Sequence, residues 1–236
     1  MNHDLDDKLT SVLTSLKDAP VTLMLDSAET PASIEVIVNW HDFLNLLHWM
    51  LYNPESLRYA PLLINETEKG DLAVLTQLMN TVFPAPKNDV AAPTGAFFAI
   101  TCNDQYRDRT QFAPPSGRYD GFAITSFMET VCETPEFSFS GHNMKAPVQS
   151  DTPALLLTGY FDPMTPDIYA EQTQRLFPNS HLVSVPNFGH STLSGFMACQ
   201  TVLAKSFIDT LEKTDAFACA DTLPGPNFVL PAAIAQ

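Results

Sequence analysis

The sequence predicts an α/β protein, in which a mostly helical region precedes a strand–helix–strand–helix segment. Three observations predict this class. Apolar residues recur at helical spacing through residues 1–90. A short, wholly apolar run at residues 154–158 is typical of a buried strand. A second strand pattern follows after an intervening helix pattern, which is the arrangement of a βαβ unit.

Residues 1–94 are expected to form a helical region that packs on another part of a protein. Three apolar stripes predict three amphipathic helices. They comprise Leu5, Leu9, Val12, Leu13 and Leu16; Phe43, Leu47, Met50 and Leu51; and Leu72, Leu75, Met79 and Val82. Pro20 ends the first helix, Asn53-Pro54 ends the second, and Gly70-Asp71 offers an N-cap for the third. We expect no strand of a parallel sheet between these helices.

Residues 95–150 are expected to lead from this helical region into the next strand. The apolar run Gly95–Cys102 predicts a buried strand. Residues 103–150 have weak periodicity and predict an irregular connection.

Residues 151–236 carry the clearest pattern. Ala154–Thr158 is apolar throughout, so we expect a parallel strand that is covered on both faces. Thr165 as N-cap and Pro166 at the first helical position predict a helix that runs to about Phe177. His181–Val185 predicts the second strand. The last helix follows from the stripe of Phe196, Leu203, Phe207 and Leu211.

The charge of the chain argues against nucleic acid as a partner. Lys and Arg total 12 against 27 Asp and Glu, for a formal net charge of -15. A surface this acidic repels phosphate backbones. No apolar run approaches the roughly 20 residues that span a bilayer, so we expect no membrane partner either. No cofactor is implied. His41 and His48 share one helix face, but a helix surface is favoured over a metal site there.

Four cysteines, Cys102, Cys132, Cys199 and Cys219, bear on the redox compartment. None forms a CxxC pair, so a zinc or thioredoxin-type site has no support. An even number at wide spacing suits two disulfides, with three connectivities open. Pairing of sequence neighbours is the simplest arrangement, and four buried free thiols are the competing interpretation.

Asp162 and His190 form the strongest candidate for chemistry. Each follows a predicted strand of the same βαβ unit, at the carboxyl edge where ligands bind in open α/β sheets. Neighbouring strands lie about 4.8 Å apart, so the two loops are expected to emerge side by side. A carboxylate there can accept a hydrogen bond from one ring nitrogen and orient the imidazole as a base. Gly159 and Gly189 give the backbone freedom beside them. Acid before histidine is the order of a Ser-Asp-His hydrolase.

The stretch Leu155–Pro166 with Gly189-His190 resembles the C-terminal part of tripeptidyl aminopeptidase-like α/β-hydrolases, which are related to proline iminopeptidases. Leu51-Tyr52-Asn53-Pro54 and Gly70-Asp71 resemble the helical cap of that family, and Cys199 and Cys219 its C-terminal cysteine pair. The resemblance implies a partial α/β-hydrolase core with a helical cap. It also implies Asp162 as the triad acid, His190 as the base, and a secreted aminopeptidase that acts on peptides or on small esters and amides.

The chain departs from this family at the nucleophile. A nucleophile elbow needs G-x-S-x-G between strand and helix, and none of the 236 residues supplies that match. Ser191 follows His190 directly and lacks the second glycine. We therefore expect the C-terminal portion of a serine hydrolase whose Ser lies upstream, inactive by itself and prone to self-association through an exposed sheet edge. The alternatives are a non-catalytic fragment or binding module, and the same portion of a capped esterase.

Two further groups of residues are candidates for substrate binding. An aminopeptidase must bind a free α-amine, for which a cap carboxylate is suited; the candidates are Glu29, Glu35, Glu66 and Glu68. Surface charge is the favoured role of each. Trp40 and Trp49 could line a groove, but packing in a helix core is favoured.

Overall fold

A computed structural model of the chain describes residues 3–26, 32–82, 94–102, 131–132, 147–190 and 198–230. The contacts group the chain into two compact units, each made of two segments. Unit 1 is Met1–Asn45 with Leu75–Ala146, and unit 2 is Leu46–Val74 with Pro147–Gln236. The boundaries expected after residues 94 and 150 differ from these and stay predictions.

Unit 1 begins with α1 (His3–Asp18), which confirms the first predicted helix. A β-hairpin follows, made of β1 (Val21–Asp26) and β2 (Ser33–Val38) in antiparallel register. The helical stripes did not predict this hairpin, and its strands are antiparallel rather than strands of a parallel sheet. Leu23 and Leu25 are buried while Met24 between them is exposed, which is the two-residue period of a strand with one covered face.

Two further helices of the predicted set are present. The helix α2 (Trp40–Met50) begins at Asn39, whose side chain accepts hydrogen bonds from the backbone N–H groups of His41 and Asp42. Asp42 in turn accepts from the backbone N–H of Asn39, so the two ends of the first turn cap one another. The helix α5 (Ala73–Val82) begins after Asp71, whose side chain accepts from the backbone N–H of Ala73.

The apolar run after residue 94 is a helix and not the expected strand. The helix α6 spans Thr94–Ile100, and Phe97 and Ile100 on it are about half exposed. A short apolar run does not separate a strand from a helix by periodicity alone, and its two alanines favour a helix. The chain then reaches Cys102, which is buried and forms a disulfide with Cys132.

The first segment of unit 2 contains two short helices. The helix α3 (Pro54–Leu57) starts at Asn53, whose side chain caps it by accepting from the backbone N–H of Glu55. The helix α4 (Ala60–Glu68) follows. Gly70, with a φ of +82°, ends this segment in a backbone conformation that favours glycine.

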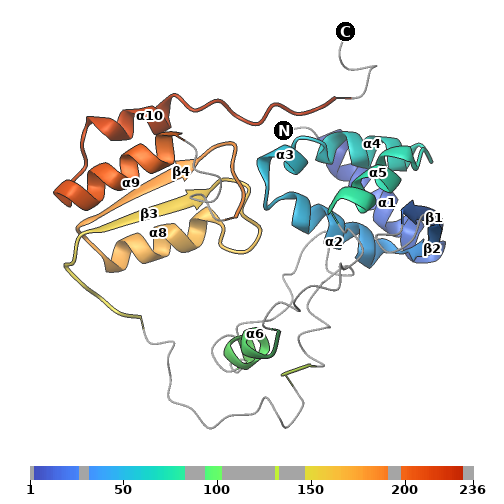
Figure 1. The fold of residues 1–236 in the computed structure, drawn as a ribbon, viewed down its shortest axis with the longest axis horizontal. Helices are drawn as coiled ribbons and strands as arrows, with labels where there is room; N and C mark the ends of the chain where they lie inside the picture. The colour runs from blue at the N-terminus through green and yellow to red at the C-terminus, as the bar shows by residue number, and fades with distance from the viewer. Residues whose placement is uncertain are drawn as a thin grey trace. The chain divides into compact units, whose positions relative to one another are not determined.

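The second segment of unit 2 is the predicted strand–helix–strand–helix unit (Figure 1). The strands β3 (Ala154–Gly159) and β4 (Ser180–Val185) pair in parallel, from Ala154 opposite Ser180 to Gly159 opposite Val185. The helix α8 (Asp167–Leu176) connects them. Beyond β4 come α9 (Ala198–Thr210), a 3-10 turn η5 (Asp215–Phe217) and α10 (Ala218–Asp221).

The helices cover the two faces of this sheet unequally. Figure 1 shows α8 on one face and α9 with α10 on the other. Leu203, Phe207 and Phe217 form the buried cluster on the second face, against Leu155 and Leu157 of β3. The helix α8 has no buried residue, and Ala154–Leu157 of β3 are half-buried. Helices therefore lie on both faces of β3, as expected, although most of the strand is not fully buried.

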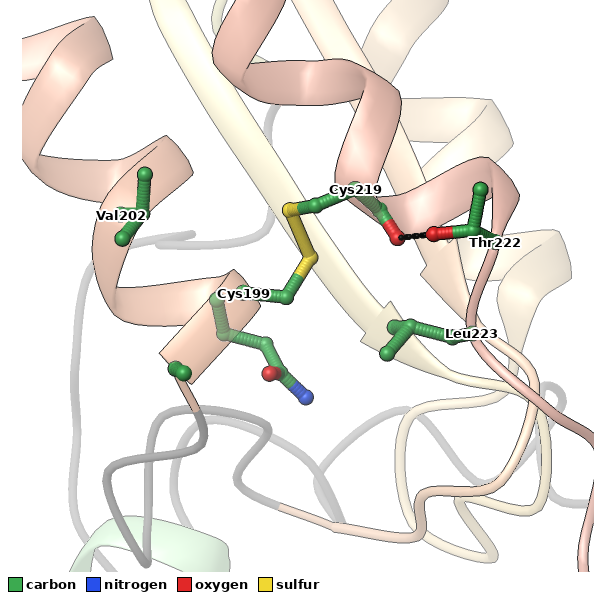
Figure 2. Close-up of a pocket in the computed structure, with 7 residues that line it drawn as sticks. Cys199, Val202, Cys219, Thr222 and Leu223 are labelled. Atoms are coloured by element: carbon green, nitrogen blue, oxygen red, sulfur yellow. Dashed lines mark hydrogen bonds between the residues drawn. A yellow bond between two sulfur atoms is a disulfide. The ribbon is translucent and has the colours of Figure 1, made fainter.

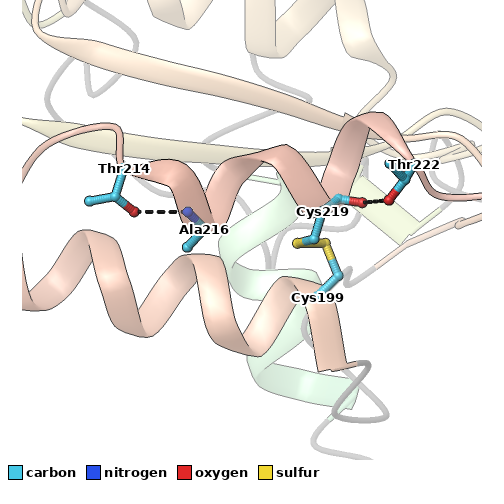
Figure 3. Close-up of a disulfide and its surroundings, with 5 residues drawn as sticks. All are labelled: Cys199, Thr214, Ala216, Cys219 and Thr222. Carbon is cyan, nitrogen blue, oxygen red and sulfur yellow. Dashed lines mark hydrogen bonds between the residues drawn. A yellow bond between two sulfur atoms is a disulfide. The ribbon is translucent and has the colours of Figure 1, made fainter.

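The disulfide Cys199–Cys219 ties the start of α9 to α10 (Figure 3). Thr214 begins the intervening turn, where its side chain accepts a hydrogen bond from the backbone N–H of Ala216. Both disulfides join sequence neighbours, as in the simplest predicted pairing. None of the helices in the described ranges combines the length and apolar character needed to cross a bilayer.

Candidate active site

Asp162 lies in the loop that leaves β3, and the loop holds its carboxylate in place. The residue is 7% exposed. Its Oδ1 accepts hydrogen bonds from the backbone N–H groups of Met164 (2.8 Å) and Thr165 (2.9 Å), and its Oδ2 accepts from the Thr165 hydroxyl (2.6 Å). Thr165 was predicted as the N-cap of the next helix. That assignment was wrong by one residue, since Pro166 is the N-cap and the Thr165 hydroxyl binds Asp162 instead.

Asp167, which follows this loop, binds side chains of both strands of the sheet. Its Oδ1 accepts a hydrogen bond from Thr158 of β3 (2.9 Å), and its Oδ2 accepts one from Ser184 of β4 (2.8 Å). As the first residue of α8, its negative charge also suits the positive end of the helix dipole. The loop of Asp162 is therefore anchored at both ends by neighbouring strands.

The loop after β4 runs against the loop of Asp162. The backbone N–H of Phe161 donates to the carbonyl of Phe188 at 3.0 Å. A Cβ atom on Gly159 would lie 2.0 Å from the Gly189 carbonyl oxygen, and one on Gly189 would lie 1.6 Å from that of Leu51. Among the described glycines only Gly70 has positive φ, so close approach rather than backbone freedom is what requires glycine at these two positions.

This approach brings His190 onto Asp162. The imidazole Nδ1 of His190 lies 2.9 Å from Oδ2 and 3.1 Å from Oδ1 of Asp162. When Nδ1 carries the proton it donates to the carboxylate, and Nε2 then keeps a free lone pair. The side chain of His190 is one-third exposed. The pair has the arrangement of an oriented general base.

The electrostatics of Asp162 favour its ionised form. Burial alone raises the pKa of this carboxyl group, but the hydrogen bonds from Thr165, Met164 and His190 outweigh it. The resulting pKa lies below the ordinary value, and Asp162 is a carboxylate at neutral pH. It can therefore stabilise a positive charge that develops on His190.

Three ring-bearing residues at the end of α2 and the turn after it stand beside this pair, within unit 2. The ring of Tyr52 lies 4.9 Å from that of His190, between centroids. The rings of Trp49 and His48 lie 4.9 Å and 5.3 Å from Tyr52. Trp49 is 46% exposed, so the preference for packing in a helix core was wrong for it. Sequence reasoning placed neither Tyr52 nor His48 at the site.

The charges of Asp162 and His190 also affect the pKa values of the neighbouring side chains. Burial lowers the pKa of His48, Asp162 acts in the opposite direction, and a charge on His190 lowers it further. Burial, followed by the negative charge of Asp162, raises the pKa of Tyr52. Both side chains are therefore held neutral next to the one carboxylate.

No interaction joins the other predicted residues that the structure describes to this group. Glu66 is half-buried and accepts from Asn65 and Lys69, while Glu35 and Glu68 are exposed. Glu29 and Ser191 lie outside the described residues. Within the described part of the chain, no set of three or more His, Cys, Asp and Glu side chains is arranged to hold a metal ion.

Comparison with known proteins bears on the segment that carries this site. Residues 121–219 match the family model of the TAP-like proteins, an α/β-hydrolase family. The match contains Asp162, His190, Cys199 and Cys219, and it confirms the resemblance to the C-terminal part of tripeptidyl aminopeptidase-like hydrolases. No curated protein and no solved structure matches the chain.

Proposed function

Since residues 121–219 are those of a TAP-like α/β-hydrolase, we propose that this chain supplies the acid–base pair of a secreted serine aminopeptidase. The substrate is a peptide, from which N-terminal residues or short peptides are released. The observation that carries the proposal is the contact of His190 Nδ1 with the buried carboxylate of Asp162, at 2.9 Å.

The mechanism follows from that contact. Asp162 holds the His190 tautomer whose Nε2 is unprotonated, and Nε2 accepts the proton of a serine hydroxyl as it attacks the scissile carbonyl. His190 then donates this proton to the leaving amine, while Asp162 stabilises the imidazolium formed in between. The serine and the oxyanion hole belong to a G-x-S-x-G elbow, which the 236 residues do not contain, so a further polypeptide segment has to supply them.

The acid–base pair can be tested in the chain as it is. Nitrogen-15 NMR of the His190 ring at neutral pH is expected to show a proton on Nδ1. The replacement Asp162→Asn, which removes the negative acceptor, should shift the ring toward the other tautomer. An unchanged tautomer in Asp162→Asn would refute the role of Asp162. His190→Gln identifies the His190 signals among the six histidines, and His41→Gln, a change at a histidine of unit 1, should leave them in place.

Catalytic activity requires the G-x-S-x-G elbow, and an activity assay distinguishes the aminopeptidase from the esterase. The chain is assayed alone and together with a polypeptide that carries a G-x-S-x-G strand–turn–helix. Alone we expect no serine labelled by a fluorophosphonate probe. Together we expect hydrolysis of aminoacyl amides, reduced by about 10⁶-fold in His190→Ala. Hydrolysis of ester substrates but not of amide substrates would favour an esterase. Amide hydrolysis that persists in His190→Ala would overturn the proposal.

Recognition of a free α-amine is the finer part of the proposal. Glu35 and Glu68 are exposed and available as carboxylates, whereas Glu66 is engaged with Lys69 at 3.1 Å. Replacing Glu35 or Glu68 by Gln should raise KM only for substrates with a free amine. Equal kinetics on free and N-acetylated substrates in every variant would remove amine recognition by these residues.

Secretion is supported by the two disulfides, because such bonds persist in oxidising compartments. We propose an extracellular or periplasmic location. Thiol titration of denatured protein from its native source should find no free thiol. Four free thiols would contradict this location.

A further inference from the structure

Asp162 holds the His190 ring through one atom. The Nδ1 of that ring lies between the two carboxylate oxygens, at 2.9 Å and 3.1 Å. A contact at one ring atom lets the imidazole tilt about that atom, and a tilt carries Nε2 away from the place where it accepts a proton. A catalytic group has to stay within about 0.5 Å and about 10–20° of its productive geometry. A second contact on the ring is therefore needed to fix its orientation.

Tyr52 makes such a contact. The centroids of the Tyr52 and His190 rings lie 4.9 Å apart, and the two ring planes are inclined by 57°. This spacing is typical of paired rings. Burial, followed by the negative charge of Asp162, raises the pKa of Tyr52, so its side chain is neutral and adds no charge to the site. Tyr52 therefore acts on the imidazole through contact and not through charge.

The backbone brings Tyr52 to this place. The peptide between Leu51 and Tyr52 packs so closely on Gly189 that a Cβ atom there would overlap the Leu51 carbonyl oxygen and lie 2.9 Å from the Tyr52 carbonyl carbon. The turn is anchored on both sides, since the N–H of Tyr52 donates to the carbonyl of Trp49 at 3.2 Å and the side chain of Asn53 caps α3. The Trp49 ring also packs against that of Tyr52, 4.9 Å away. Tyr52 thus reaches the site from a fixed turn.

We propose that Tyr52 is a positioning residue, which keeps the His190 ring in the orientation in which Nδ1 donates to Asp162 and Nε2 accepts the proton of the serine. This inference rests on the proposed function, because the orientation of the ring matters to catalysis only where His190 acts as the base. It adds the turn at residues 51–53 to the machinery of the site, although the family match at residues 121–219 does not include that turn.

The test follows the Nδ1 proton of His190 by nitrogen-15 NMR of the full chain. Tyr52→Leu removes the ring and keeps an apolar side chain, whereas Tyr52→Phe keeps the ring. We expect this proton to exchange with water roughly 2- to 10-fold faster in Tyr52→Leu, which is the range that corresponds to the contact of one aromatic pair. Tyr52→Phe should match the parent. Unchanged exchange in Tyr52→Leu, or faster exchange in Tyr52→Phe as well, would overturn the inference. Should Tyr52→Leu not fold, Tyr52→Met replaces it with the same expected result.

Two controls separate positioning from a general loss of stability. Tyr169→Leu removes an exposed tyrosine of α8 and should leave the exchange unchanged. Joint replacement of Cys199 and Cys219 by Ala destabilises the same unit elsewhere. Figure 2 shows this disulfide beside a hollow lined by α9, α10 and the residues just after α10, and its described lining contains neither Tyr52 nor His190. Exchange as fast in either control as in Tyr52→Leu would refute a positioning role.

Failure of this inference differs from failure of the proposed function. A parent chain without a proton on Nδ1 would refute the acid–base pair itself, whereas unchanged exchange in Tyr52→Leu would refute only the role of Tyr52. With the elbow-bearing polypeptide added, Tyr52→Leu should lower kcat on aminoacyl amides by roughly 10- to 100-fold and leave KM unchanged. A raised KM with an unchanged kcat would mean that Tyr52 binds substrate, and it would also overturn the inference.

Discussion

The hydroxyl of Thr165 is the side-chain donor of the loop that holds Asp162, and Thr165→Val removes it with little change of shape. The two backbone N–H donors of Met164 and Thr165 remain, as does the contact with His190. The lost bond, at 2.6 Å, goes to an ionised acceptor. The change therefore isolates one charge-assisted hydrogen bond of the site.

The expected loss follows from the burial of the two partners. A hydrogen bond to a charged group contributes about 1.5–3 kcal/mol, and the exposed position of Thr165 lets water replace part of it. We therefore expect the lower end, about 1.5 kcal/mol. For a chain of this size that corresponds to a Tm lower by about 3–6 °C.

The pH dependence distinguishes this cause from a general packing defect. The folded pKa of Asp162 is lowered, so its ionisation contributes stability that is present above the unfolded value of about 3.9. That contribution is lost as the pH falls through the folded pKa. The difference between parent and Thr165→Val should thus be full at pH 7 and shrink toward acid pH.

The assay is thermal unfolding followed by circular dichroism, from pH 7 down to the lowest pH with a cooperative transition. Thr173→Val is the matched control, because the Thr173 hydroxyl donates to the neutral carbonyl of Tyr169 at 2.9 Å. Its effect should not vary with pH. A Thr165→Val deficit that is constant with pH, or absent at pH 7, would refute the reasoning.

Three further predictions concern unit 2. Joint replacement of Cys199 and Cys219 by Ala should lower the free energy of unfolding by about 3 kcal/mol, because the disulfide closes a loop of sequence separation 20 in the unfolded chain. Urea titration without reductant measures this loss, and an unchanged free energy of unfolding would contradict the prediction. Gly189→Ala places a Cβ 1.6 Å from a backbone carbonyl oxygen and should cost about 3 kcal/mol or more, whereas Gly225→Ala, with open space around it, should be neutral in the same assay. The lowered pKa of His48 gives stability that is full above the unfolded value of about 6.5 and is lost as the pH falls below it. His48→Gln should therefore flatten the stability profile between about pH 7 and 5, and an unaltered slope would exclude His48 as its source.

The acid–base pair shows how far local sequence patterns reach. Asp162 and His190 were placed side by side from two strand patterns, because parallel neighbours in a βαβ unit must present the same edge. The distance between them and the pinning of Asp162 by Thr165 depend on how the two loops contact each other. Those contacts carry no periodic signal along the chain.

The strand predicted at Gly95–Cys102 and the unpredicted hairpin show where local sequence patterns fail. Gly95–Ile100 is apolar enough for either a strand or a helix, and only its surroundings select the helix α6. The hairpin of β1 and β2 does have a local signal, because Leu23 and Leu25 are buried and Met24 between them is exposed.

The order of acid and histidine, the helical stripes and the even number of cysteines follow from the amino-acid sequence, since each depends on neighbours a few residues apart or on composition. The contact of Tyr52 with His190 and the glycine contacts at Gly159 and Gly189 appear only once the chain is folded. Each of these features depends on the distances between residues that are remote in the sequence. Packing of the folded chain sets such distances, and local propensity does not.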